Sequence, residues 1–130
     1  SREAGRSLLE AVRRVRKGRS VLIYPEGTRS KDASVIQDFK PGTLVVARQS
    51  RAPILPIIVY GSQQVLPETA RKYVMPHHLI IRVLPAIEAD DPIHPASAGA
   101  DEAAEEHHIR ELRRFIQNEY DRVKSDHHIS

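Results

Sequence analysis

The 130-residue sequence contains no cysteine, which excludes disulfide bridges and thiolate chemistry and agrees with a reducing compartment. It has no signal-peptide pattern and no apolar run near the roughly 18 residues needed to cross a bilayer. It also shows no internal repeat and no low-complexity segment. These absences leave a globular chain of one domain at most, long enough to bury about two thirds of its unfolded surface.

Charge gives only a mild indication of partners. The chain has 20 Lys and Arg against 17 Asp and Glu, a net charge of +3. This balance permits a phosphate headgroup, an anionic membrane or a nucleic acid as partner, and it is too small to choose among them. The seven histidines are three adjacent pairs and His94. Because adjacent residues do not share a face of a helix or strand, we expect no metal site.

Hydrophobic spacing alternates between the period of helices and short runs of strand-forming residues. It predicts helices at residues 3–17, 43–50 and 101–124, and strands at residues 20–24, 54–60 and 79–84. Gly18 is expected to end the first helix in a left-handed conformation. The strand at 54–60 is expected to be buried on both faces, and Pro56 indicates an edge, a bulge or a later start. The pattern predicts an α/β fold, a layered and largely parallel sheet flanked by helices.

A polar loop follows the first expected strand. In the run Tyr24–Ser30, YPEGTRS, Pro25 cannot donate to a sheet ladder and so ends the strand. Loops at the carboxyl ends of strands in α/β sheets commonly bind ligands. Gly27 lets a ligand approach the backbone, and Thr28 and Ser30 offer hydroxyl groups. Arg29 offers a planar fork that fits phosphate oxygens. The residues alone support an anion site and an ordinary turn with a surface ion pair equally well.

The end of the first expected helix is strongly basic. Its cations are Arg13, Arg14, Arg16, Lys17 and Arg19. They can contact anionic lipid headgroups. The simpler interpretation is a solvated helix face that complements the helix dipole.

Three blocks in order carry a resemblance to a known family. Tyr24–Ser30 resembles the Phe-Pro-Glu-Gly-Thr-Arg-Ser block of the glycerolphosphate acyltransferases, the PlsC-like lysophosphatidate acyltransferases, with Tyr in place of the first Phe. Phe39–Gly42 resembles their Phe-Lys-x-Gly block, and Pro53–Ile57 resembles their Val-Pro-Ile-x-Pro-Val block. The resemblance covers about residues 1–62. The family fold needs more strands than this chain offers, so we expect a single domain over 1–130, truncated at the N-terminus, that is the C-terminal portion of an acyltransferase domain and frays at 126–130.

The resemblance implies the transfer of a fatty acyl group from acyl-CoA or acyl carrier protein to the free hydroxyl of 1-acylglycerol 3-phosphate, giving phosphatidate, without a cofactor besides that thioester. Related acceptors stay open, namely glycerol 3-phosphate, dihydroxyacetone phosphate and lysophospholipids, as does a non-catalytic module that binds phosphate or an anionic membrane. The family's catalytic base lies in a His-x-x-x-x-Asp block. None of the seven histidines here is followed by Asp five positions on. We therefore expect no catalytic residue in this chain, and no activity of the chain alone.

The resemblance also assigns the binding residues. Those for the acceptor phosphate are Glu26, Gly27, Thr28, Arg29 and Ser30, of which Arg29 is the first candidate and Glu26 is expected to orient Arg29 or a backbone amide. Those for the acyl donor, or for shaping the site, are Phe39, Lys40, Gly42, Pro53, Ile54, Pro56 and Ile57, although the prolines can equally just set the start of a strand. The implied partners are lysophosphatidate, an acyl thioester and an anionic membrane surface, with no nucleic acid. We also expect self-association through sheet surface that the truncation exposes, a soluble fragment, and a parent protein at the cytoplasmic face of a membrane.

Overall fold

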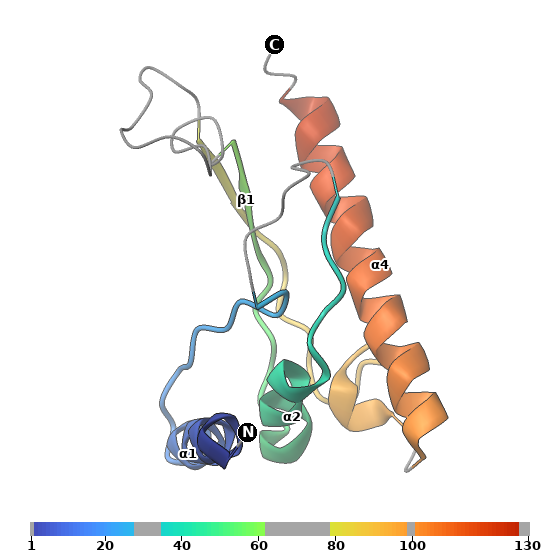
Figure 1. The fold of residues 1–130 in the computed structure, drawn as a ribbon. Coiled ribbons are helices and arrows are strands. Elements are labelled where there is room, and N and C mark those ends of the chain that lie inside the picture. Colours follow the sequence, from blue (N-terminus) through green and yellow to red (C-terminus); the bar gives the residue numbers. More distant parts are fainter. Residues whose placement is uncertain (1, 28–34, 62–78, 99–100, 128–130) are drawn as a thin grey trace.

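The computed structural model describes residues 2–27, 35–61, 79–98 and 101–127 (Figure 1). Along the chain these residues form α1 (Arg2–Arg16), α2 (Pro41–Ser50), β1 (Ile57–Tyr60), β2 (Ile80–Val83), the 3-10 helix η1 (Pro95–Ser97) and α4 (Glu102–Asp126). All three helices predicted from the hydrophobic spacing are confirmed, with bounds within two residues of the prediction. Helix α4 runs alongside the strand pair, and α2 lies between α1 and α4 (Figure 1).

Helix α4 supplies one wall of the first hydrophobic core cluster. It starts at Asp101, whose Oδ1 accepts a 2.6 Å hydrogen bond from the Ala104 amide and so satisfies one free N–H of the first turn. Tyr60 of β1 meets Tyr120 of α4 edge to face, with ring centroids 5.6 Å apart. The cluster consists of Ile58, Tyr60, Leu84, Tyr120 and Val123. Burial of each such side chain contributes roughly 1.5–3 kcal/mol.

A second cluster binds the segment before α2 to the same helix. Phe39, Ile87 and Leu112 form its buried centre. Ile36 adds two hydrogen bonds to α4, because its N–H donates to Gln117 Oε1 at 2.6 Å and its carbonyl accepts from Arg113 Nη1 at 2.8 Å. The extended chain at 35–40 is therefore fixed along α4 by both side-chain packing and backbone bonds.

Helix α1 packs on α2 rather than on the sheet. Val12 of α1 and Val46 of α2 are both buried. Arg16 Nη2 of α1 donates to the Gln49 carbonyl of α2 at 3.0 Å. The helix ends as predicted: Gly18 has φ +87°, and the Arg19 amide returns to the Arg14 carbonyl at 3.0 Å.

The sheet differs from the prediction in two respects. Strands β1 and β2 pair antiparallel, with Ile57 opposite Val83 and Tyr60 opposite Ile80, whereas a largely parallel sheet was expected. Only one face of β1 is buried, because α4 covers that face and no described residue covers the other. On the uncovered face the side chains of Ile57, Val59, Ile81 and Val83 are between 44% (Val59) and 60% (Ile81) exposed. We call these four residues the outer apolar face.

Of the alternatives predicted for Pro56, the structure shows a strand that begins after it, because β1 starts at Ile57. Pro56 is buried directly before β1, and its carbonyl accepts from the Leu84 amide at 3.0 Å. A proline can accept but not donate in a ladder, so the continuous pairing starts at the next residue. Ile54 forms a separate bridge to Ile87 through bonds of 2.9 and 2.7 Å.

The strand predicted at residues 20–24 is not formed. No described segment pairs with these residues, and Leu22 is 73% exposed. A run of strand-forming residues becomes a strand only when a neighbour accepts and donates its backbone hydrogen bonds. The apolar composition of this run favours a strand, and the pairing that a strand requires is absent from the described part of the chain.

Candidate functional site

The first part of the predicted acceptor block is a tight turn. The Gly27 amide donates to the Tyr24 carbonyl at 3.0 Å, and Gly27 has φ +74°. A positive φ is strained for residues with a side chain and easy for glycine. The conformation of this turn therefore accounts for glycine at position 27.

Two hydrogen bonds join this turn to the segment before α2. The Lys40 amide donates to the Pro25 carbonyl at 2.7 Å, and Glu26 Oε2 accepts from the Gln37 amide at 2.8 Å. A hydrogen bond to a charged group contributes about 1.5–3 kcal/mol. Of the two roles expected for Glu26, the described contact is the one to a backbone amide.

Lys40 lies directly over Gly27. A Cβ atom placed on Gly27 would meet Lys40 Cγ at 3.1 Å, Cε at 3.5 Å and Cδ at 3.9 Å. The aliphatic stem of Lys40 therefore occupies the space above the glycine, although the resemblance grouped Lys40 with the acyl-donor residues. The first two blocks of the sequence meet at this contact.

The other two predicted site residues of the second block, Phe39 and Gly42, hold the block in place. Phe39 is buried in the second core cluster. Gly42 is in the first turn of α2, where an added Cβ would meet Leu8 Cδ1 at 3.2 Å. Glycine at 42 lets α1 and α2 approach closely, and phenylalanine at 39 fixes the backbone beside Lys40.

The third block forms the start of the sheet. Pro53 is exposed, Ile54 bridges to Ile87, Pro56 is buried before β1, and Ile57 belongs to the outer apolar face. These described contacts favour the structural alternative for both prolines, and the acyl-donor assignment stays a prediction.

His94 is the residue that sequence reasoning missed. It is 0% exposed, its Nε2 lies 2.8 Å from the Ala52 carbonyl, and its Nδ1 accepts from the Ala96 amide at 2.9 Å. These partners select the neutral ring with its proton on Nε2. His94 thus links η1 to Ala52, the residue directly before the third block. The only local signal was its place before Pro95, where a helix N-cap residue stands.

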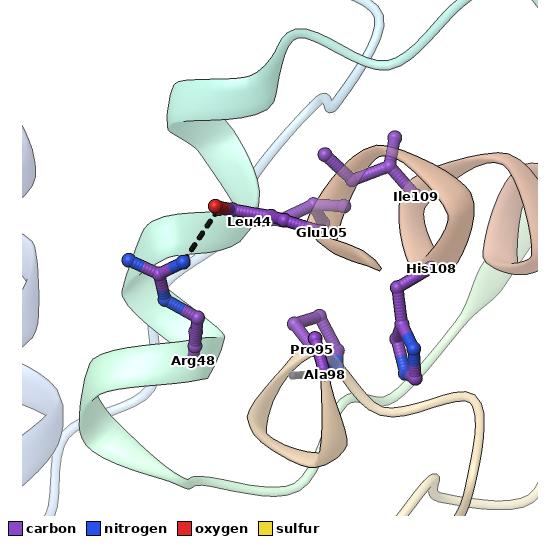
Figure 2. A pocket seen from close by; sticks show the side chains of 7 residues that line it. All are labelled: Leu44, Arg48, Pro95, Ala98, Glu105, His108 and Ile109. Carbon is purple, nitrogen blue, oxygen red and sulfur yellow. Dashed lines mark ion pairs between the residues drawn. The ribbon is translucent and has the colours of Figure 1, made fainter. Parts of the chain in front are cut away.

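A small hollow between α2, η1 and α4 is too small to be a substrate site. Figure 2 shows its lining residues, among them Arg48 and Glu105, which form an ion pair of 2.6 Å. His108, one turn along α4 from Glu105, has a buried Nε2 without a hydrogen-bond partner. The hollow has a volume of about 10 Å³, which suits about one water molecule.

The remaining site predictions fall outside the described part of the chain or are not addressed by it. Thr28, Arg29 and Ser30 lie outside the described residues, so their phosphate-binding roles stay predictions. Among the described residues, no group of three or more His, Asp or Glu side chains is arranged to hold a metal ion. No helix in that part of the chain is long and apolar enough to cross a membrane.

The sequence blocks and the fold both have counterparts in known proteins. The model of the family described as Acyltransferase matches residues 1–60, which include the acceptor block, the Phe39–Gly42 block and the third block. A 1-acyl-sn-glycerol-3-phosphate acyltransferase of Limnanthes douglasii is 37% identical over 86 residues, which are 65% of this chain and 30% of that protein. The chloroplastic 1-acyl-sn-glycerol-3-phosphate acyltransferase of Brassica napus is 38% identical over 66 residues, 48% of this chain and 19% of that protein.

A solved structure extends the similarity of fold beyond residue 60. The 1-acyl-sn-glycerophosphate acyltransferase PlsC of Thermotoga maritima aligns with a TM-score of 0.65 at 22% identity, over 87% of this chain and 44% of that one. The match to the acyltransferase family model covers the first 60 of the 130 residues, and the α/β fold is confirmed. The resemblance to the PlsC-like lysophosphatidate acyltransferases is confirmed with it, over a chain that spans less than half of each of these relatives.

Proposed function

We propose that this chain is the acceptor-binding part of an enzyme that transfers a fatty acyl group to the free hydroxyl of 1-acylglycerol 3-phosphate, giving phosphatidate. The observation that carries the proposal is the contact between the first two family blocks. Lys40 covers Gly27, and the amides of Lys40 and Gln37 donate to the Pro25 carbonyl and the Glu26 carboxylate. The relatives that share these blocks are named for this activity.

The proposed reaction is an acyl transfer between a thioester and an alcohol. The acceptor oxygen forms an ester bond to the acyl carbon, and the carbon–sulfur bond of acyl-CoA or acyl carrier protein breaks. The hydroxyl proton passes to a general base and then to the thiolate that leaves, so no cofactor is needed besides the thioester. A positioned general base contributes roughly 10²- to 10⁴-fold in rate. Because this sequence has no His-x-x-x-x-Asp block, we propose that the chain alone binds the acceptor without transferring the acyl group.

In this proposal the residues of the first block hold the acceptor's phosphate. Arg29 forms charge-assisted hydrogen bonds to phosphate oxygens, and Thr28 and Ser30 donate hydroxyl groups. Gly27 gives the turn its left-handed conformation, and Glu26 holds the turn against Gln37.

We also propose that the parent protein works at an anionic membrane surface on the cytoplasmic side, where a lysophosphatidate acceptor resides. Support comes from the basic residues at the end of α1, all of which are exposed. Arg13 and Arg14 share the carboxylate of Glu10 at 3.8 and 3.3 Å. Lys17 and Arg19 extend the basic surface past the helix end. Lys and Arg near an anionic leaflet contribute about 1 kcal/mol each.

The experiment that tests the acceptor site is an NMR titration of the chain with glycerol 3-phosphate, run in parallel on Arg29→Ala. We expect saturable shifts at Glu26 and Gly27, and a dissociation constant that is roughly 10- to 100-fold higher in the variant, as loss of a charge-assisted bond predicts. The amide spectrum of the variant away from the block should match the wild type, because a loop charge carries little fold stability.

An equal affinity of wild type and Arg29→Ala would refute the anion site. A second candidate function is a non-catalytic module that binds phosphate or anionic membrane, which the missing His-x-x-x-x-Asp block favours. Residues that precede Ser1 in the gene separate the two candidates, since a His-x-x-x-x-Asp block there supports the enzyme. Parallel titrations with dihydroxyacetone phosphate and a short-chain lysophospholipid separate the related acceptors.

A further inference from the structure

Leu9 is an exposed apolar side chain near the middle of α1. It is 54% exposed and belongs to neither core cluster. The buried side of the helix is marked by Leu8, whose Cδ1 lies 3.2 Å from the Cβ position of Gly42 in α2, and by the buried Val12. Successive residues of a helix point about 100° apart, so Leu9 leaves α1 beside this buried side and towards the solvent.

Arginines surround Leu9 on the same face of the helix. Residues three, four or seven apart lie on one side of a helix. Arg6 and Arg13 are therefore one turn before and after Leu9, and Arg2 and Arg16 are two turns away. All four arginines are exposed. We call Leu9 and these four residues the arginine face of α1.

The carboxylates nearby leave this part of the chain positive. Glu10 is shared by Arg13 at 3.8 Å and Arg14 at 3.3 Å, so one negative charge meets two guanidinium groups. Exposed ion pairs of this kind contribute little to stability, and the guanidinium groups can exchange them for another anion. Residues 2–27 contain seven Lys and Arg against three Glu, a net charge of +4, whereas the whole chain has +3. The excess positive charge of the molecule is thus concentrated around α1.

An exposed leucine among arginines fits the surface of an anionic bilayer. Guanidinium groups bind phosphate oxygens with two parallel hydrogen bonds. Basic amphipathic helices lie in the headgroup region with their apolar side chains at the boundary to the acyl chains. A protein partner fits less well, because the centre of a protein interface is depleted of charged residues, and Leu9 is the single apolar member of the arginine face.

We propose that the arginine face of α1 docks on an anionic phospholipid bilayer, with Leu9 at the boundary between headgroups and acyl chains and the arginines on lipid phosphates. This inference rests on the proposed function, in which the parent protein works at an anionic membrane, and it names the surface that makes the contact.

The test is co-sedimentation of the chain with vesicles of phosphatidylcholine alone and with vesicles of equal parts phosphatidylcholine and phosphatidylglycerol. We expect the wild type to bind the anionic vesicles and to lose binding as salt is raised, because salt screens exposed charges. The double variant Arg6→Gln/Arg13→Gln should weaken binding roughly 10- to 30-fold, because two cations are lost from the contact. Leu9→Ser should weaken it roughly tenfold, because less apolar surface leaves water.

Each variant has a matched control on another element. Arg110→Gln/Arg122→Gln removes two exposed arginines of α4. Arg122 is 71% exposed and pairs with a glutamate three residues before it, as does Arg13, which is 70% exposed. Leu79→Ser changes a leucine that is 51% exposed and directly precedes β2. We expect both controls to bind like the wild type, and the amide spectrum of every variant to match the wild type away from its substitution.

Four outcomes would overturn the proposal. Equal losses in the two arginine pairs would show that net charge alone matters. An unchanged affinity in Leu9→Ser would show that this side chain stays outside the bilayer. Equal binding to both kinds of vesicle would remove the role of anionic lipid. Binding of soluble polyglutamate by a wild type that binds neither vesicle would assign the face to an acidic protein.

The titration with glycerol 3-phosphate keeps the two levels of inference apart. If Arg29→Ala weakens glycerol 3-phosphate binding and no variant changes vesicle binding, the docking surface is wrong and the proposed acceptor site stands. If the vesicle results hold and Arg29→Ala has the affinity of the wild type, the acceptor site is wrong and the docking surface stands.

Discussion

At the scale of single residues, the described structure gives separate duties to residues that sequence similarity groups together. Within the block Phe39–Gly42, Phe39 is buried in a core cluster, Lys40 covers Gly27, and Gly42 lets α1 approach closely. Residues of one sequence motif therefore need not all bind a ligand. Phe39 and Gly42 hold the backbone on either side of Lys40.

Gly27 offers a direct test at this scale. We expect Gly27→Ala to lower the free energy of unfolding by about 1–3 kcal/mol, because φ of +74° is strained for alanine and its Cβ would lie 3.1 Å from Lys40 Cγ. Urea denaturation measures the difference.

The matched control for this variant is Gly5→Ala. Gly5 lies in α1, and a Cβ added there would meet no atom within 4 Å. Alanine in a helix interior is favoured over glycine by about 0.5–1 kcal/mol, so this variant should gain stability. Equal changes in both variants would contradict the special conformation of Gly27.

At the scale of secondary-structure elements, the sequence was a good guide to the helices and a poor one to strand pairing. Helices α1, α2 and α4 have their hydrogen bonds inside one segment, so their spacing of apolar residues is enough to locate them. A strand at 20–24 or the direction of pairing between β1 and β2 depends on a partner elsewhere in the chain, which local composition does not specify. The bond from Gln37 to Glu26 and the bond from His94 to Ala52 are equally non-local.

His94 gives a prediction for the elements that it links. We expect His94→Gln to preserve the bond to Ala52, since the amide nitrogen of glutamine reaches about as far as Nε2, and His94→Asn to preserve the cap on Ala96, since its amide oxygen replaces Nδ1. Each variant should lose about 1–3 kcal/mol of stability, the cost of one unsatisfied buried group.

Hydrogen exchange separates the two variants. The amides of Ile54 and Ile87, which bond across the bridge next to Ala52, should exchange faster in His94→Asn than in His94→Gln. The opposite order would show that the cap on η1, and not the bond to Ala52, holds this region.

At the scale of the whole molecule, the outer apolar face is a contiguous exposed apolar surface of the described sheet. Four large apolar side chains of β1 and β2 are side by side there, while α4 covers the other face of the sheet (Figure 1). Contiguous exposed apolar surface of this kind favours association. The expected partners for it, a second copy of the chain or a further part of an acyltransferase domain, remain predictions.

We expect the chain to self-associate in sedimentation experiments, and Ile81→Lys to shift it towards monomer. A lysine on the sheet face opposes the pairing of apolar surfaces. Leu22→Lys is the control, because Leu22 is an exposed apolar residue that lies outside the sheet. A monomeric wild type with a sharp melting transition would count against association through the outer apolar face.

Two hydrogen bonds join residues 25–26 to residues 37–40, and a backbone amide donates each of them. A bond donated by the main chain does not depend on which side chain the donor residue carries. The side chains at positions 37 and 40 can therefore be exchanged while the junction between the two segments is kept.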